Sequence, residues 1–198
     1  MPPKTTFTRD MFIEAAFRVV RKEGIGKLSA RSLARELNCS TMPIYSYLKS
    51  MRNLREDLQK KAVDLLLSYQ NTPRSGMPFY DMGLGYVLFA RNEKNLFRFI
   101  FTDASRGLKK RKTGINLQRF ALDSLIDNMK FDPQLEGVDG RQAENIMVKM
   151  WIFVHGIAFL LNTNQMPDDS EDYINQLIYE TGKFVIEGET GKKLNAGN

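Results

Sequence analysis

Hydrophobic residues recur at intervals of three and four along most of the chain, a spacing that predicts amphipathic helices. The first segment places five apolar residues on one face of a helix that Thr8 caps and Gly24 ends: Phe12, Ala15, Ala16, Val19 and Val20. No segment shows the period-two alternation of a strand. We therefore expect an all-α fold of about nine helices.

Residues 28–48, LSARSLARELNCSTMPIYSYL, indicate two short helices joined by a tight turn. Ser29 is a good N-cap for the first helix, and Asn38 tolerates the left-handed conformation that often ends one. In the second helix Ile44 and Leu48 are four residues apart and point inward. Its outer surface is then left to Thr41, Met42, Pro43, Tyr45, Ser46 and Tyr47. Hydroxyls that bond phosphates and base edges, beside apolar groups that touch thymine methyls, suit the DNA major groove.

Further helices follow the same spacing in the rest of the chain. They are predicted over residues 51–69, where Ser50 can cap the fourth helix, over 78–91, 92–101, 115–129 and 141–162, and from a cap in MPDDSED, residues 166–172, to about residue 187. The stretch 71–78 is rich in Pro, Gly and Ser, which marks a break between domains. We expect three parts: a helix-turn-helix domain over residues 1–50 with its motif at about 29–48, a connecting helix over 51–70, and a C-terminal regulatory and dimerisation domain over 71–198.

The excess positive charge lies in the N-terminal third of the chain. The net charge is +6, and residues 1–70 hold 13 Lys and Arg against 7 Asp and Glu, whereas residues 71–198 hold 16 of each. Lys and Arg that neutralise phosphates supply most non-specific affinity for DNA, so the asymmetry supports DNA binding. A merely solvated basic face is the alternative. The basic stretch 104–114 we interpret as an exposed loop, with a second DNA contact as the alternative.

The composition offers little support for several other classes of protein. No apolar run approaches the ~20 residues of a membrane span, and the N-terminus lacks the apolar core of a secretion signal, so we expect a cytoplasmic protein. One Cys and one His form no metal-ligand cluster, and no Gly-rich phosphate loop occurs, so we expect no metal and no cofactor. The pattern names no nucleophile or orienting acid for His155, so we expect a packing or hydrogen-bonding role for it and no enzymatic activity.

Residues 7–66 resemble the first four helices of the TetR family of bacterial transcriptional regulators in order and spacing. The segment IYSYL, residues 44–48, is similar to the family's recognition-helix signature, and WIFVHGIAFLL, residues 151–161, resembles a Trp–His–Gly motif in its dimer-forming helix. The resemblance implies a homodimer that binds a palindromic double-stranded DNA operator through two recognition helices. It also implies a repressor that a small apolar or amphipathic ligand releases from DNA by binding the C-terminal domain.

The positions that match the family's motif imply two sets of DNA contacts. Arg31, Thr41, Met42, Pro43, Tyr45 and Ser46 would face bases, and Ser29, Tyr47, Lys49 and Arg52 would contact or approach phosphates. The family usually has a Lys after the third helix, where this chain has Met51. We expect Lys49 and Arg52 to supply the positive charge instead.

The C-terminal part is rich in aromatic and Met side chains, most of which we expect in the core. Such a helical domain also suits an apolar cavity. We expect a cavity between the helices that begin at Pro78, Ile115 and Arg141, with these lining residues: Tyr86, Phe89, Phe97, Phe120, Met147 and Trp151. The last two long helices are expected to form the dimer, because segment 146–161 is apolar on every side.

Two other functions stay open. One is a DNA-binding regulator that a protein partner controls without a small-molecule ligand, which a fully packed C-terminal core would favour. The other is a small basic helical enzyme, against which the lack of a catalytic constellation argues.

Overall fold

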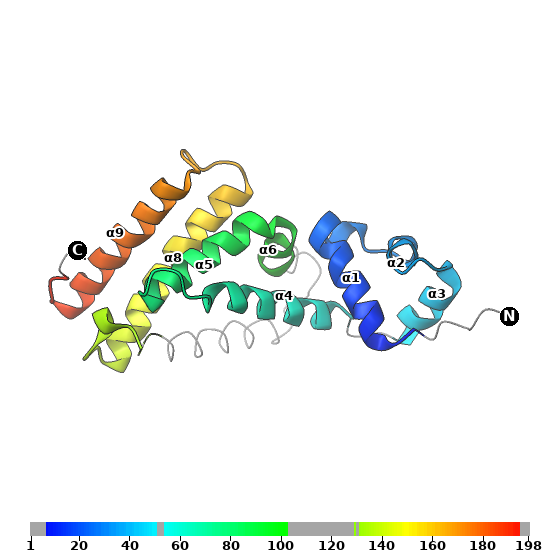
Figure 1. Ribbon diagram of the computed structural model, residues 1–198, viewed down its shortest axis with the longest axis horizontal. Coiled ribbons are helices and arrows are strands. Elements are labelled where there is room, and N and C mark those ends of the chain that lie inside the picture. Colours follow the sequence, from blue (N-terminus) through cyan, green and yellow to red (C-terminus); the bar gives the residue numbers. More distant parts are fainter. Residues whose placement is uncertain (1–6, 51–53, 103–128, 130, 195–198) are drawn as a thin grey trace. The chain divides into compact units, whose positions relative to one another are not determined.

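All regular elements among the described residues are helical (Figure 1). The computed structural model describes residues 7–50, 54–102, 129 and 131–194. Its elements are α1 (Arg9–Glu23), η1 (Ile25–Lys27), α2 (Ala30–Glu36), α3 (Thr41–Ser50), α4 (Leu54–Gln70), α5 (Pro78–Asn92), α6 (Lys94–Phe101), η2 (Pro133–Leu135), α8 (Gly140–Asn162) and α9 (Glu171–Thr190). The predicted all-α fold is confirmed. The predicted helix over 115–129, apart from Met129, and the predicted loop 104–114 lie outside the described residues.

The described chain forms two compact units. The first holds the residues up to 65 together with those from 93 to 102, and the second holds the others. Helix α6 packs against α1 in the first unit, although α5 of the second unit precedes it directly in the chain. The Pro-, Gly- and Ser-rich stretch 71–78 predicts a domain boundary, but it does not predict that the chain returns to the first unit at α6.

The core of the first unit consists of the apolar faces that the spacing predicts. Its buried side chains include Phe12, Ala16, Val19, Val20, Leu33, Ile44, Leu58, Ala62, Leu96, Phe97 and Phe99. Each fully buried large apolar side chain contributes roughly 1.5–3 kcal/mol. Helix α1 is capped by Thr8, whose Oγ1 accepts the N–H of Met11, and it ends at Gly24, as predicted.

Polar contacts fasten α6 to the end of α1. The carboxylate of Glu93 is 5% exposed and accepts two bonds from the Arg21 guanidinium, one of them 2.7 Å long between Nε and Oε2. The Asn95 amide donates to the carbonyls of Arg21 and Lys22 at 3.1 and 3.0 Å. Because the last carbonyls of a helix have no partner within it, Asn95 satisfies the end of α1 from another element.

Helices α5, α8 and α9 pack together in the second unit (Figure 1). Both ends of α5 are fastened to other elements: Asp132 accepts the N–H of Phe79 at 2.8 Å, and the Asn162 amide donates to the carbonyl of Ala90 at 3.0 Å. Asp132 and Asn162 are themselves buried. Buried polar groups of this kind are stable only when paired, so they fix α5 in one position.

Predicted and observed helix ends agree closely at most sites. Helix α5 begins at Pro78 as predicted, and α8 begins at Gly140, where Asp139 and Gln142 form a reciprocal cap. The predicted cap of the fourth helix is wrong, because Ser50 is the last residue of α3.

Helix α8 is long and apolar enough to cross a membrane by length and composition, and no other described helix is. The sequence has no uninterrupted apolar run of this length. Helix α8 passes the test because its mean hydropathy is averaged over polar and apolar positions. One such helix is a weak indication, because core helices pass the same test. One face of α8, including Ile146, Val154 and Leu161, is buried within the second unit.

Candidate nucleic-acid interface

The turn between α2 and α3 has a defined hydrogen-bonding pattern. Asn38 has a φ of +50°, the left-handed conformation that the sequence predicts for it. Its N–H donates to the carbonyl of Arg35 at 3.2 Å, and the N–H of Cys39 donates to the carbonyl of Ala34 at 2.9 Å. This pair of bonds is the Schellman arrangement, which satisfies the last carbonyls of α2. The chain is thereby redirected within four residues into α3.

Among the described side chains of helix α3, one is buried and others are exposed to solvent. Ile44 is fully buried, as predicted, whereas Met42 is 79% and Tyr45 57% exposed. Thr41 and Pro43 are partly exposed in the first turn. Single exposed apolar residues are normal on a protein surface, whereas a contiguous apolar patch can mark an interaction surface. Ser46, Tyr47, Leu48 and Lys49 belong to α3, but their side chains lie outside the described residues, as does all of Arg52.

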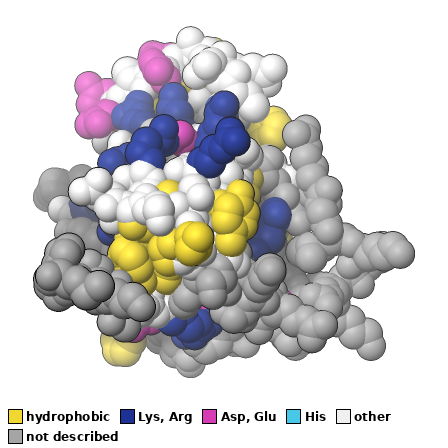
Figure 2. All heavy atoms as spheres, turned by 90° about the vertical axis from the view of Figure 1, so that its right-hand side faces the viewer, with side chains coloured by type: hydrophobic (Ala, Val, Ile, Leu, Met, Phe, Trp, Pro, Cys, Tyr) yellow, Lys and Arg dark blue, Asp and Glu magenta, His cyan; other side chains and the backbone are white. Residues whose placement is uncertain are grey.

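Unpaired cations lie on the elements around α3. Among the described residues, Lys27 and Arg31 are exposed and have no acidic partner within ion-pair distance, whereas Arg35 pairs with Glu23 at 2.5 Å. Figure 2 shows Lys and Arg side chains, with Asp and Glu side chains among them, near a hydrophobic patch on the end of the first unit that carries α2 and α3. Such a face combines a positive field with groups able to touch bases.

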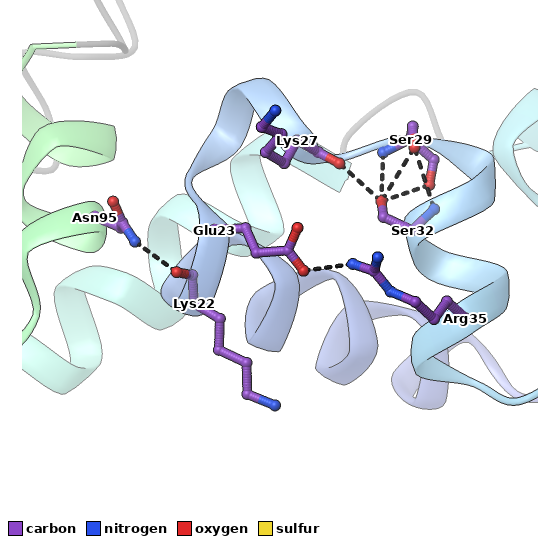
Figure 3. Close-up of polar contacts among 7 residues, drawn as sticks. All are labelled: Lys22, Glu23, Lys27, Ser29, Ser32, Arg35 and Asn95. Atoms are coloured by element: carbon purple, nitrogen blue, oxygen red, sulfur yellow. Dashed lines mark hydrogen bonds and ion pairs between the residues drawn. The ribbon is translucent and has the colours of Figure 1, made fainter.

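Ser29 uses its side chain to cap α2 (Figure 3). Its Oγ accepts the N–H of Ser32 at 3.2 Å, and Ser32 Oγ accepts the N–H of Ser29 at 2.9 Å. Ser32 Oγ also donates to the carbonyl of Lys27 at 2.8 Å, which fastens η1 to the start of α2. The hydroxyl of Ser29 therefore helps to orient the first turn of α2, and Arg31 lies in that turn.

A cavity lies in the second unit, between α5, α8, α9 and the last residue of α4. Its empty space, including the space at its mouth, is about 690 Å³. The described lining residues are mostly aromatic, Met and aliphatic: Phe79, Tyr80, Met82, Gly83, Tyr86, Met147, Met150, Trp151, Val154, Ile178, Tyr179, Gly182, Ile186 and Leu194, with Gln70, Gln134 and Lys183 as the other polar members. This mostly apolar lining with a few polar groups is typical of a site for a small organic ligand.

The structure brings together half of the predicted lining residues. Tyr86, Met147 and Trp151 line the cavity. Phe89 is buried but is not part of the described lining, and Phe97 is buried in the core of the first unit. Phe120 lies outside the described residues.

His155 forms a polar contact behind the cavity wall. Its Nδ1 is 2.7 Å from the hydroxyl of Tyr86, and its ring stacks on Trp151 with centroids 5.6 Å apart. Burial lowers the pKa of His155 and raises that of Tyr86, so both groups are neutral at neutral pH, and the tautomer of the imidazole sets which of them donates the hydrogen bond. The packing and hydrogen-bonding role predicted for His155 is confirmed.

The sequence pattern did not predict the polar residues that line the cavity, nor Asp132, which holds the start of α5 beside it. Gln70, Gln134 and Lys183 come from three elements far apart in the chain, and no local spacing connects them. Asp132 carries a partial signal, since an Asp directly before a Pro often caps a turn, and it does accept the N–H of Gln134. Its second partner, Phe79, is 53 residues away in sequence and cannot be read from the pattern.

A scan against protein-family models matches none of them, and a search of the curated proteins finds no match.

Within the described residues no group of three or more His, Cys, Asp or Glu side chains could hold a metal ion.

Proposed function

We propose that the protein is a sequence-specific DNA-binding transcriptional regulator of the TetR type, acting as a homodimer on a palindromic operator. The observation that carries the proposal is the surface of α2 and α3. There Met42 and Tyr45 project from a short helix whose Ile44 is buried, and the unpaired cations Lys27 and Arg31 lie on the two elements that precede this helix, η1 and α2. A short helix held by a tight turn, with an exposed face flanked by cations, suits the major groove.

The exposed apolar surface of α8 and α9 supports the homodimer. These exposed side chains are Val148, Trp151, Ile152 and Phe159 on α8, and Tyr173 and Phe184 on α9. Apolar side chains on two adjacent helices are stabilised when a second surface covers them. Gly156 lies on the same stretch of α8 with no heavy atom within 4 Å of a Cβ built there, so a partner helix can approach closely.

The cavity in the second unit supports control by a small ligand rather than by a protein partner alone. A ligand that binds best to a dimer with a changed spacing of its recognition helices must weaken DNA binding reciprocally. DNA requires that spacing to be one helical turn, about 34–36 Å. We propose that ligand binding releases the dimer from its operator.

The test is selection of bound sequences from a random pool of DNA, followed by binding measurements on the selected site. A homodimer selects a palindrome. Arg31→Ala and Tyr45→Ala are then expected to weaken binding to that site by about tenfold or more each, as for loss of a base contact. Arg141→Ala removes an exposed Arg of the second unit and serves as the matched control.

Circular dichroism would establish that each variant is folded. Unchanged affinity in folded Arg31→Ala and Tyr45→Ala would refute the placement of the DNA-reading surface. Selection of no common sequence by the wild-type protein would refute sequence-specific recognition itself.

A further inference from the structure

We infer that the cavity of the second unit binds an elongated amphipathic organic anion, with its charged group at Lys183 and a neutral polar group near Gln70. This inference rests on the ligand-responsive part of the proposed function and names the chemical class of the ligand.

The cavity extends along α9. Its lining on that helix extends from Ile178 to Ile186, which corresponds to about 12 Å at 1.5 Å per residue. At one end, a Cβ built on Gly83 would lie 3.4 Å from Ile178, and Tyr86 follows one turn later on α5. At the other end lie Ile186 and Leu194. The walls between are Met and aromatic side chains, so the body of the ligand is apolar.

Lys183 is the one formally charged residue in the described part of the lining. Its Nζ forms an ion pair with Glu187 Oε1 at 3.9 Å, a separation too long for a hydrogen bond, and that oxygen accepts the N–H of Leu194 at 2.8 Å. Among the described residues the ammonium has no acceptor within hydrogen-bonding distance. An anionic group bound here would be attracted by the positive charge of the ammonium and would accept hydrogen bonds from its N–H groups. Hydrogen bonds between charged groups are stronger than those between neutral groups.

Gln70 supplies a second polar group, at the α5 wall of the cavity near Gly85. It is 7% exposed, lines the cavity and hydrogen-bonds through its side chain to no described residue. The amide can both donate and accept a hydrogen bond, so a neutral polar group of a ligand that reaches it can pair with it. Its position is fixed by the crossing of α4 and α5, where a Cβ built on Gly85 would lie 2.7 Å from Gln70 Cα.

Trp151 makes binding directly observable, because it is the single Trp of the chain and lines the cavity. The experiment titrates the whole protein, without DNA, with octanoate, 1-octanol and octylamine, and follows the Trp emission. Octanoate is expected to bind about tenfold more tightly than octanol, as for one charge-assisted hydrogen bond. Octylamine is expected to bind more weakly than either.

Variants of Lys183 separate the charge from the apolar contribution. Lys183→Met is expected to lower octanoate affinity about tenfold and to leave octanol affinity unchanged, which also shows that the cavity is intact. Lys183→Glu is expected to reverse the order of octanoate and octylamine. Lys149→Met, a substitution outside the lining at a residue paired with Glu189, is the matched control and should bind like the wild type.

The Gln70 amide has its own probe, 8-hydroxyoctanoate. The wild type is expected to bind it about fivefold more tightly than octanoate, as for one neutral hydrogen bond, and Gln70→Leu should abolish that difference. Equal binding of the two acids by the wild type would refute the role of Gln70.

The charge inference is overturned if octanoate and octanol bind equally, if Lys183→Met weakens both alike, or if none of the probes changes the Trp emission saturably. Its failure is distinct from failure of the proposed function, because operator binding is measured separately. A protein that selects a palindrome but ignores these anions retains its DNA-binding function and loses only this ligand class.

Discussion

At Gly85 the backbones of α4 and α5 come into direct contact. A Cβ built there would lie 2.2 Å from the carbonyl oxygen of Tyr69, far inside the contact distance, and the obstacle is backbone that cannot rotate away. The same contact places Gln70 at the cavity. Gly85 is therefore required for the position of a polar group that belongs to the candidate ligand site.

Gly85→Ala is expected to destabilise the protein by about 1–3 kcal/mol, because the helices must move apart to admit the methyl group. Gly83→Ala in the same helix is the control: its Cβ would make ordinary contacts of 3.4 Å with Ile178 and Val154. Since Ala is the better helix former, this variant should be neutral or more stable by up to about 1 kcal/mol. Urea denaturation of both measures the difference, and equal effects would contradict the clash.

His155 is expected to make stability depend on pH. Burial lowers its pKa from the ordinary 6.5. Below that pH the unfolded chain binds more protons than the folded one, so stability falls as the pH drops, until the folded histidine is protonated as well. His155→Gln keeps a polar group without the titration and should lose less stability between pH 7.5 and 5.5 than the wild type does. Urea denaturation at both values tests this, and identical pH dependence would refute it.

At the level of elements, local signals predict helices well and their partners poorly. The cap at Thr8, the left-handed turn at Asn38 and the start of α5 at Pro78 are set by a few neighbouring residues, and the structure confirms all three. The return of α6 to α1 depends on Glu93 and Asn95 meeting residues more than 70 positions away, which no periodicity encodes. For the same reason Tyr86 and Trp151 could be anticipated as lining residues, whereas the polar residues of the cavity could not.

Ser29 has two roles that one pair of substitutions can separate: its observed role as the cap of α2 and its proposed contact with phosphate. Ser29→Ala is expected to destabilise the first unit by about 1 kcal/mol, because the N–H of Ser32 loses its acceptor. Ser29→Asp retains a good cap and is expected to keep wild-type stability. The added negative charge should nevertheless weaken DNA binding if the hydroxyl lies near phosphate.

Thermal unfolding and operator binding, measured on both variants, distinguish the roles. Wild-type DNA affinity in Ser29→Asp would place Ser29 away from the phosphates and leave it as a cap only.

For the whole molecule, the exposed stripe on α8 leads to a prediction about assembly. Val148, Ile152 and Phe159 recur on one side of the helix around Gly156, and Ile152 is 60% exposed. In a homodimer this side is buried, and a carboxylate placed there would be desolvated without a partner. In a monomer the same carboxylate would remain in water and change little.

Ile152→Asp is therefore expected to shift the protein from a dimer to a species with the 22.8 kDa mass of one chain, measured by sedimentation equilibrium. Phe131→Asp is the control, since Phe131 is more exposed than Ile152, at 79%, but lies outside α8 and α9. Loss of the dimer should also weaken binding to a palindromic operator, because each protomer then reaches a single half-site. A wild-type protein that sediments as one chain, or an Ile152→Asp variant that remains dimeric, would remove this surface as the dimer interface and with it the geometric basis for reading two half-sites.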